Sequence, residues 1–114
     1  MSETVPRGFS FEQTIPYEAP ESLDELHGPT SGIVRVGPHI NTSPNPIYDL
    51  SKPAQQWSLY SAVVRDGLAR EQVALLNRGM LLALWADLNL PARCRSIWEG
   101  KFPELAELSR TKAS

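Results

Sequence analysis

Apolar residues recur at helical spacing throughout the second half of the chain, and this pattern predicts a set of short helices. The first is expected to follow Ser51, a suitable N-cap residue, with Pro53 in its first turn, and to end at Gly67. Four more are predicted at about 69–76, from an Asn77 cap through Trp85, over Pro91–Glu99 with Gly100 as its stop, and from Pro103 onward. The expected core residues are Trp57, Tyr60, Trp85, Leu88 and Trp98. The predicted fold is mainly α, a compact bundle of about five short helices.

The first half of the chain has a different pattern, in which prolines interrupt any long helix. Seven of the ten prolines lie in the first 50 residues, and proline disfavours helical backbone at its own and the preceding position. One or two helical turns are expected over Pro20–His27, with Gly28 ending them, and Gly32–Val36 reads as one short β-strand. We therefore predict an extended, proline-rich arm over 1–46, a helical domain over 47–110 and a disordered tail over 111–114.

Charge is divided between the same two halves. Residues 1–31 carry six acidic side chains and one arginine, a net charge of -5, whereas residues 32–114 carry ten basic and seven acidic side chains, a net charge of +3. An extended acidic segment could enter the basic groove of a partner, guided by long-range attraction. The alternative is a disordered tail that only keeps the chain in solution.

Composition narrows the class of protein. The chain has 114 residues, enough for one small domain, and one cysteine, which excludes an internal disulfide. It has no apolar run near the roughly 20 residues of a membrane span. The first residues lack the basic and apolar regions of a signal peptide. A cytoplasmic location without membrane attachment is therefore expected.

Few residues point to chemistry. His27 and His39 are twelve positions apart and lack nearby cysteine or acidic ligands, so no metal site is predicted. Cys94 lies between two arginines, but helical spacing places it with Ile97 and Trp98, which favours a buried core residue over a reactive thiol. No phosphate-binding glycine loop is present. We expect neither a cofactor nor catalysis.

DNA binding is the main rival to protein binding. Residues 70–87 could form a helix–turn–helix, but the would-be recognition helix contains Met80–Trp85, with almost no side chain that reads base edges. Six basic side chains could still contact the DNA phosphates: Arg65, Arg70, Arg78, Arg93, Arg95 and Lys101. The alternative is that these residues form a solvated basic face.

The acidic arm offers the most specific binding hypothesis. Its acidic residues Glu18, Glu21, Asp24 and Glu25 are the candidates for a partner's basic groove. Its strand residues Ile33, Val34 and Val36 are the candidates for strand pairing with a partner, because one strand cannot stand alone. The competing interpretation is an ordered loop that packs on the helices of the same chain.

Four stretches resemble a group of small actinobacterial proteins. They are Ile47–Pro53, Leu59–Gly67, Leu81–Pro91 and Trp98–Leu105, which follow the order of a Y-D-L segment, an L-Y-x-x-V-L-x-x-G helix and an L-W-P-x-L-x-L-P-x-x-V-R-x-x-W-E run. Ala86 stands where that pattern has proline, and Cys94 where it has valine. Such proteins tend to be paired with nucleotidyltransferase-like (AbiE-type) toxins. The resemblance covers about residues 47–105 and implies a toxin–antitoxin partnership.

The sequence therefore supports one primary hypothesis about function and two alternatives. The primary reading is an antitoxin-like module that neutralises a nucleotidyltransferase-type toxin by direct contact, with the acidic arm in the toxin's substrate groove. The second is a small DNA-binding transcriptional regulator, whose affinity would fall steeply with salt. The third is a non-catalytic subunit of a larger assembly, in which the arm would order against neighbouring copies as an oligomer.

Overall fold

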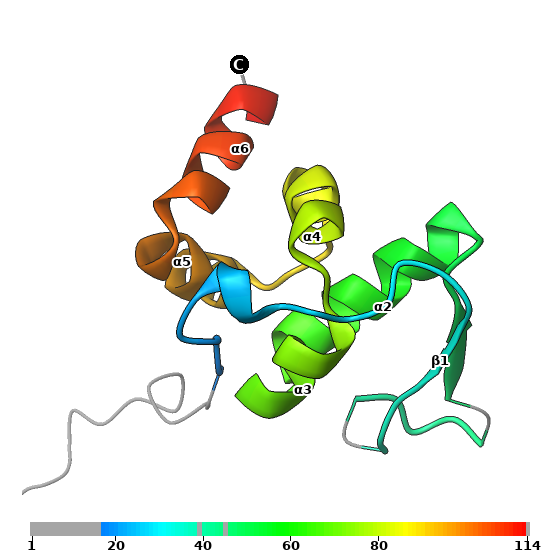
Figure 1. Cartoon of the computed structure of the whole chain (residues 1–114). Helices are drawn as coiled ribbons and strands as arrows, with labels where there is room; N and C mark the ends of the chain where they lie inside the picture. Colours follow the sequence, from blue (N-terminus) through cyan, green and yellow to red (C-terminus); the bar gives the residue numbers. More distant parts are fainter. Residues whose placement is uncertain (1–16, 39, 45, 114) are drawn as a thin grey trace, which may run out of the picture.

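The computed structural model describes residues 17–38, 40–44 and 46–113 (Figure 1). Within these residues the fold is mainly α, with five α-helices, two short 3-10 helices and a two-stranded sheet. The helices are α2 (Pro53–Asp66), α3 (Ala69–Leu75), α4 (Arg78–Leu84), α5 (Ala92–Lys101) and α6 (Pro103–Ala113). The 3-10 helices are η1 (Leu23–Glu25) and η2 (Trp85–Asp87). The sheet lies at one end of the molecule and α6 at the other. The predicted mainly helical fold is confirmed.

The helix boundaries follow local signals, with two corrections. Asn77 caps α4 as predicted, because its Oδ1 accepts a hydrogen bond from the Met80 amide at 3.1 Å. Ser51 is not the N-cap of α2: that position is Lys52, and Ser51 instead donates to the Asp49 carboxylate. Gly100 does not stop α5, which runs on to Lys101. Pro103 sets that end, because proline pushes the preceding residue out of helical backbone.

The C-terminal boundary also differs from the prediction. Helix α6 continues to Ala113, so residues 111–113 are helical rather than part of a disordered tail. Residues 105–113 carry no proline or glycine that would end the helix earlier.

The expected strand forms, and it pairs within the chain. Strand β1 (Ile33–Arg35) lies antiparallel to β2 (Ile47–Asp49), with Val34 opposite Tyr48 at the centre of the register. Gly32 has a φ of 91°, a backbone conformation that favours glycine, at the point where the chain enters β1. The pairing crosses the boundary predicted at residue 46, so arm and helical domain share one sheet.

One apolar core joins both halves of the chain. Tyr60, Trp85, Leu88 and Trp98 are buried in it, as predicted. Trp57 is not a core residue: it is 37% exposed, at the edge of the apolar face of α2, and its Nε1 donates to the Asp87 carbonyl oxygen at 2.6 Å. The arm adds five buried residues to this core: Leu23, Leu26, Val34, Val36 and Ile40. From Tyr17 onward, the described part of the arm is therefore part of the domain.

Candidate partner-binding site beside helix α3

The N-terminal segment, here residues 17–28, holds helix α3 at both of its ends. At the helix start, Glu18 Oε1 accepts a hydrogen bond from the Ala69 amide at 2.8 Å. At the helix end, the amides of His27 and Gly28 donate to the carbonyl oxygens of Val73 (3.0 Å) and Leu76 (2.7 Å). A helix of seven residues is too short to be stable alone. Its position therefore depends on tertiary contacts, which this segment provides together with α2.

The close approach at Gly28 requires a glycine. A Cβ at this position would overlap the backbone carbonyl group of Leu75 and would lie 2.7 Å from the Leu76 nitrogen. These atoms belong to the backbone and cannot rotate away as a side chain would. Gly28 was expected to end a helix, and it does lie just beyond η1, but its main role is to allow this contact.

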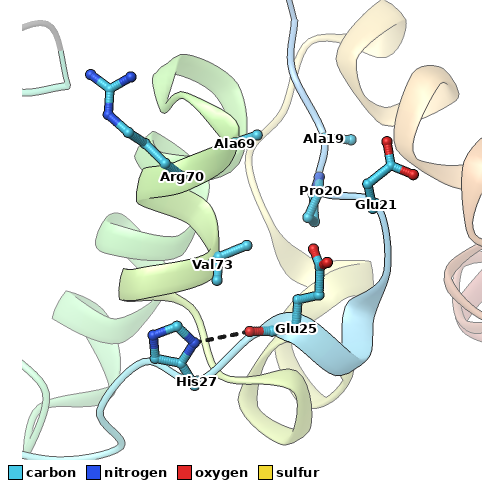
Figure 2. Close-up of a pocket in the computed structure, with 8 residues that line it drawn as sticks. All are labelled: Ala19, Pro20, Glu21, Glu25, His27, Ala69, Arg70 and Val73. Carbon is cyan, nitrogen blue, oxygen red and sulfur yellow. Dashed lines mark hydrogen bonds between the residues drawn. The ribbon is translucent and has the colours of Figure 1, made fainter.

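A hollow of about 640 Å³ opens between the N-terminal segment and α3 (Figure 2). Its apolar walls are formed by Ala19, Pro20, Ala69 and Val73. Its polar rim is formed by Glu21, Glu25, His27 and Arg70. The Glu25 carboxylate points into the gap between the two elements, whereas the Arg70 guanidinium extends away from it. The His27 Nδ1 lies 3.0 Å from the Glu25 carbonyl oxygen, which fixes the ring beside the hollow.

The four acidic residues proposed for partner binding fall into two groups. Glu21 and Glu25 are exposed and line the hollow together. Glu18 is engaged in capping α3. Asp24 lies 3.4 Å from Arg78 Nε in an exposed ion pair, and Arg78 also contacts Glu104 at 3.0 Å. The structure therefore assembles two of the four residues into one surface.

The three strand residues proposed for docking are mostly turned inward. Val34 and Val36 are buried, with exposed fractions of 5% and 6%, because they face the domain's own core. Strand β2 pairs with β1 within the chain, so the sheet does not need a partner's strand to form, and the role of Val34 and Val36 in contacting a partner stays a prediction. Ile33 faces outward and is 63% exposed. Only Ile33 among the three remains on the surface.

The basic side chains are spread over several elements and partly engaged within the chain. Arg65 pairs with Asp66 at 2.9 Å, and Arg95 donates to the carbonyl oxygens of Trp85 and Leu88. The exposed Arg70, Arg93 and Lys101 belong to α3 and to two positions of α5. In the would-be recognition helix α4, Leu81 is fully buried. The exposed positions of this helix are Arg78, Gly79 and Ala83, so its outward face offers one side chain that can donate to a base edge or a phosphate.

Cys94 and the histidines form no reactive centre within the described residues. Cys94 is fully buried, its thiol donates to the Val64 carbonyl oxygen at 3.7 Å, and burial raises the pKa of this thiol to about 11. The interpretation of Cys94 as a core residue is confirmed. His39 lies outside the described residues. No group of three or more potential ligands that could hold a metal ion occurs in the ranges that the structure describes.

Three residues important to this surface were missed by sequence reasoning. Arg70 and His27 were considered only as a phosphate contact and a metal ligand, not as parts of a rim. Gln72 is fully buried, and its Nε2 donates to the carbonyl oxygens of Glu18 (2.9 Å) and Gly67 (3.1 Å). Its spacing of four from Leu76 was an available signal, because residues four apart share a helix face.

Comparison of the chain with protein-family models, with curated proteins and with solved structures finds no match in any of the three. Among the described residues, none of the helices combines the length and apolar character needed to span a bilayer. The functional argument therefore rests on the residues of this chain.

Proposed function

We propose that this chain is an antitoxin-like module that neutralises a nucleotidyltransferase-type toxin by direct contact. The observation that supports it is the exposed pair Glu21 and Glu25, on a folded surface beside an apolar hollow. Concave apolar surface with a few fixed polar groups is typical of binding sites. The partnership itself comes from the resemblance of residues 47–105 to toxin-paired proteins.

The fold changes how such contact would occur. From Tyr17 onward the acidic residues do not form a free strand that slides into a groove, because this segment is anchored on α3 and in the core. The proposal is instead that the folded face carrying Glu21 and Glu25 is pressed against the basic margin of the toxin's substrate groove. A nucleotidyltransferase that acts on RNA offers positive charge there, and opposite charges accelerate encounter and fix orientation.

The proposed partner also determines the cellular compartment that we expect for the complex. A toxin that modifies cellular RNA works in the cytoplasm, and the single unpaired, buried Cys94 is suited to a reducing compartment. We therefore place the complex in the cytoplasm as part of the same proposal.

The test is affinity purification of the tagged full-length chain from its native host, with bound proteins identified by mass spectrometry. We expect one nucleotidyltransferase-type protein in stoichiometric amount. The double variant E21K/E25K should lose it and fail to restore growth when that toxin is expressed. The matched control E104K/E107K makes the same change in charge on α6 and should retain both properties.

Two other results of the affinity purification would contradict the proposal. Recovery of the chain alone as a discrete oligomer would favour the assembly subunit, and recovery with duplex DNA would favour the regulator. Point variants are preferred to deletion of residues 1–31, because that deletion removes Leu23 and Leu26 from the core and both attachments of α3. A truncated chain would lose activity through unfolding, whatever the role of the acidic residues.

A further inference from the structure

The hollow beside α3 combines features that select one kind of side chain. Its walls are aliphatic, from Ala19, Pro20, Ala69 and Val73, and a carboxylate from Glu25 points into it. Lysine and arginine have a long apolar stem that packs on apolar surface and a charged end that seeks an opposite charge. The arrangement therefore complements a basic side chain along its whole length.

The charged groups on the rim indicate whether a bound side chain would be positively or negatively charged. Glu21, Glu25 and Arg70 carry the ionised side chains of the rim, and Figure 2 shows that the Glu25 carboxylate faces the gap whereas the Glu21 carboxylate is directed away from α3. Arg70 is turned away from the gap (Figure 2), so its charge lies outside the space that a ligand would enter. An anion would meet Glu25 inside, whereas a cation would be attracted by it.

The carboxylates of this rim are open to a partner. The ion pairs of the described residues include Asp24 with Arg78, but none involves Glu21 or Glu25. The contacts of Glu25 within the described residues are made by its backbone: the amide donates to the Ser22 carbonyl oxygen, and the carbonyl oxygen lies 3.0 Å from His27 Nδ1. The other two acidic residues of this segment have partners within the chain: Glu18 accepts from the Ala69 amide, and Asp24 pairs with Arg78.

We propose that this hollow is a socket for one arginine or lysine side chain of the partner protein, with the Glu25 carboxylate as its acceptor. The proposal rests on the proposed function in one respect, that the occupant belongs to a protein partner. An arginine suits the socket best, because its planar guanidinium forms paired hydrogen bonds with a carboxylate.

The first experiment needs no partner. The probe is the peptide acetyl-Gly-Gly-Arg-Gly-Gly-amide, titrated into the isotope-labelled full-length chain at low salt and followed by amide chemical shifts. The control peptide replaces arginine with citrulline, which has nearly the same shape but no charge. We expect saturable shifts concentrated in residues 19–27 and 69–73, with affinity about tenfold lower for citrulline.

Two variants test the site itself. E25Q should weaken arginine-peptide binding about tenfold, whereas E107Q on α6 should leave it unchanged. A69L keeps a helix-favouring residue in α3 but fills the hollow, and it should abolish binding by both peptides. Shifts that do not saturate, that are equal for arginine and citrulline, or that survive both E25Q and A69L would overturn the socket.

The outcomes also separate this inference from the proposed function. If the peptide binds as expected but no toxin is recovered from the host, the socket stands and the antitoxin proposal fails. If a nucleotidyltransferase is bound equally by the unaltered chain, E25Q and A69L, the antitoxin proposal stands and the socket is wrong.

Discussion

The N-terminal segment and the corner formed by η2, α5 and α6 stabilise the molecule in different ways. The segment is attached through backbone hydrogen bonds from His27 and Gly28 and through the carboxylate of Glu18. The corner is built from large side chains, with the rings of Trp85 and Trp98 5.9 Å apart between centroids. One region depends on how closely two backbones approach, and the other on how much apolar surface is buried.

Polar contacts between side chains also reinforce the corner. Arg95 lies 5.0 Å over the Trp85 ring, and Glu99 Oε2 accepts hydrogen bonds from Trp85 Nε1 (2.9 Å) and from Ser109. These contacts connect η2, α5 and α6 through side chains alone. The comparison teaches that the two regions are sensitive to different substitutions: the corner to loss of a large ring, and the segment to an added Cβ at Gly28 or loss of the Glu18 carboxylate.

Removing the Trp98 ring should have the largest effect. Trp98 is fully buried and also packs against Phe102, with ring centroids 5.8 Å apart. W98A should lower the free energy of unfolding by about 3–5 kcal/mol, measured by urea titration. W98F should cost less, because Trp98 Nε1 has no hydrogen-bond partner among the described residues and phenylalanine removes that donor. Equal losses for W98A and W98F would show that ring burial is not what stabilises this corner.

Adding one methyl group at Gly28 should come next. G28A should lower the free energy of unfolding by about 1–3 kcal/mol, because the new Cβ overlaps the Leu75 backbone. The matched control is G100A inside α5, where a Cβ meets no atom within 4 Å. That control should stabilise the chain by about 0.5–1 kcal/mol, since alanine favours helix more than glycine. If both variants had the same sign, close approach at Gly28 would not be the deciding factor.

Removing the cap from α3 should have a smaller effect. E18A deletes the acceptor for the Ala69 amide and should cost about 0.5–2 kcal/mol. E107A on the exposed face of α6 removes a carboxylate that forms a surface ion pair with Arg110, and it should cost well under 1 kcal/mol. Amide hydrogen exchange should show faster opening of α3 in E18A with α5 unchanged. Uniformly faster exchange would mean that the two regions open together.

Cys94 provides the mildest test, since its effect on stability is confined to alkaline pH. Burial raises the pKa of this thiol to about 11, above the ordinary value of 9.0. The folded state therefore retains its proton where the unfolded state loses it, and stability should decline as pH rises from about 9 to about 11. C94A should flatten this part of the pH profile in chemical denaturation. At pH 8 the folded chain should react with iodoacetamide much more slowly than the chain in urea, because Cys94 is fully buried.

Much of the helical half could be predicted because its signals are local. The Asn77 cap and the proline at the start of α6 lie within a few residues of the boundaries they set. Errors arose where two local signals competed: Gly100 suggested a stop, but Pro103 set the actual end of α5. Trp57 matched the helical period but lies at the edge of the buried face, which periodicity alone does not resolve.

The N-terminal segment and the candidate site were less predictable because their contacts are distant in sequence. The Glu18 carboxylate and the Ala69 amide are 51 positions apart, and no pattern within either stretch indicates the other. The acidic residues of the hollow were identified through charge, which does not say which carboxylates the fold itself would use. The same limit applies to β1, whose composition predicted a strand but not Ile47–Asp49 as its partner.

The attachment of the N-terminal segment to α3 also sets an order of events during synthesis. His27 and Gly28 leave the ribosome about 50 residues before the carbonyl groups of Val73 and Leu76 to which they bind. At translation rates of roughly 5–20 residues per second, the N-terminal segment of every newly made chain waits some seconds before α3, to which it binds, has been synthesised. During this interval its hydrophobic residues, Leu23 and Leu26, are exposed to chaperones and proteases. Their burial must also await Trp85, Trp98 and Leu105 of the same core, which leave the ribosome after α3.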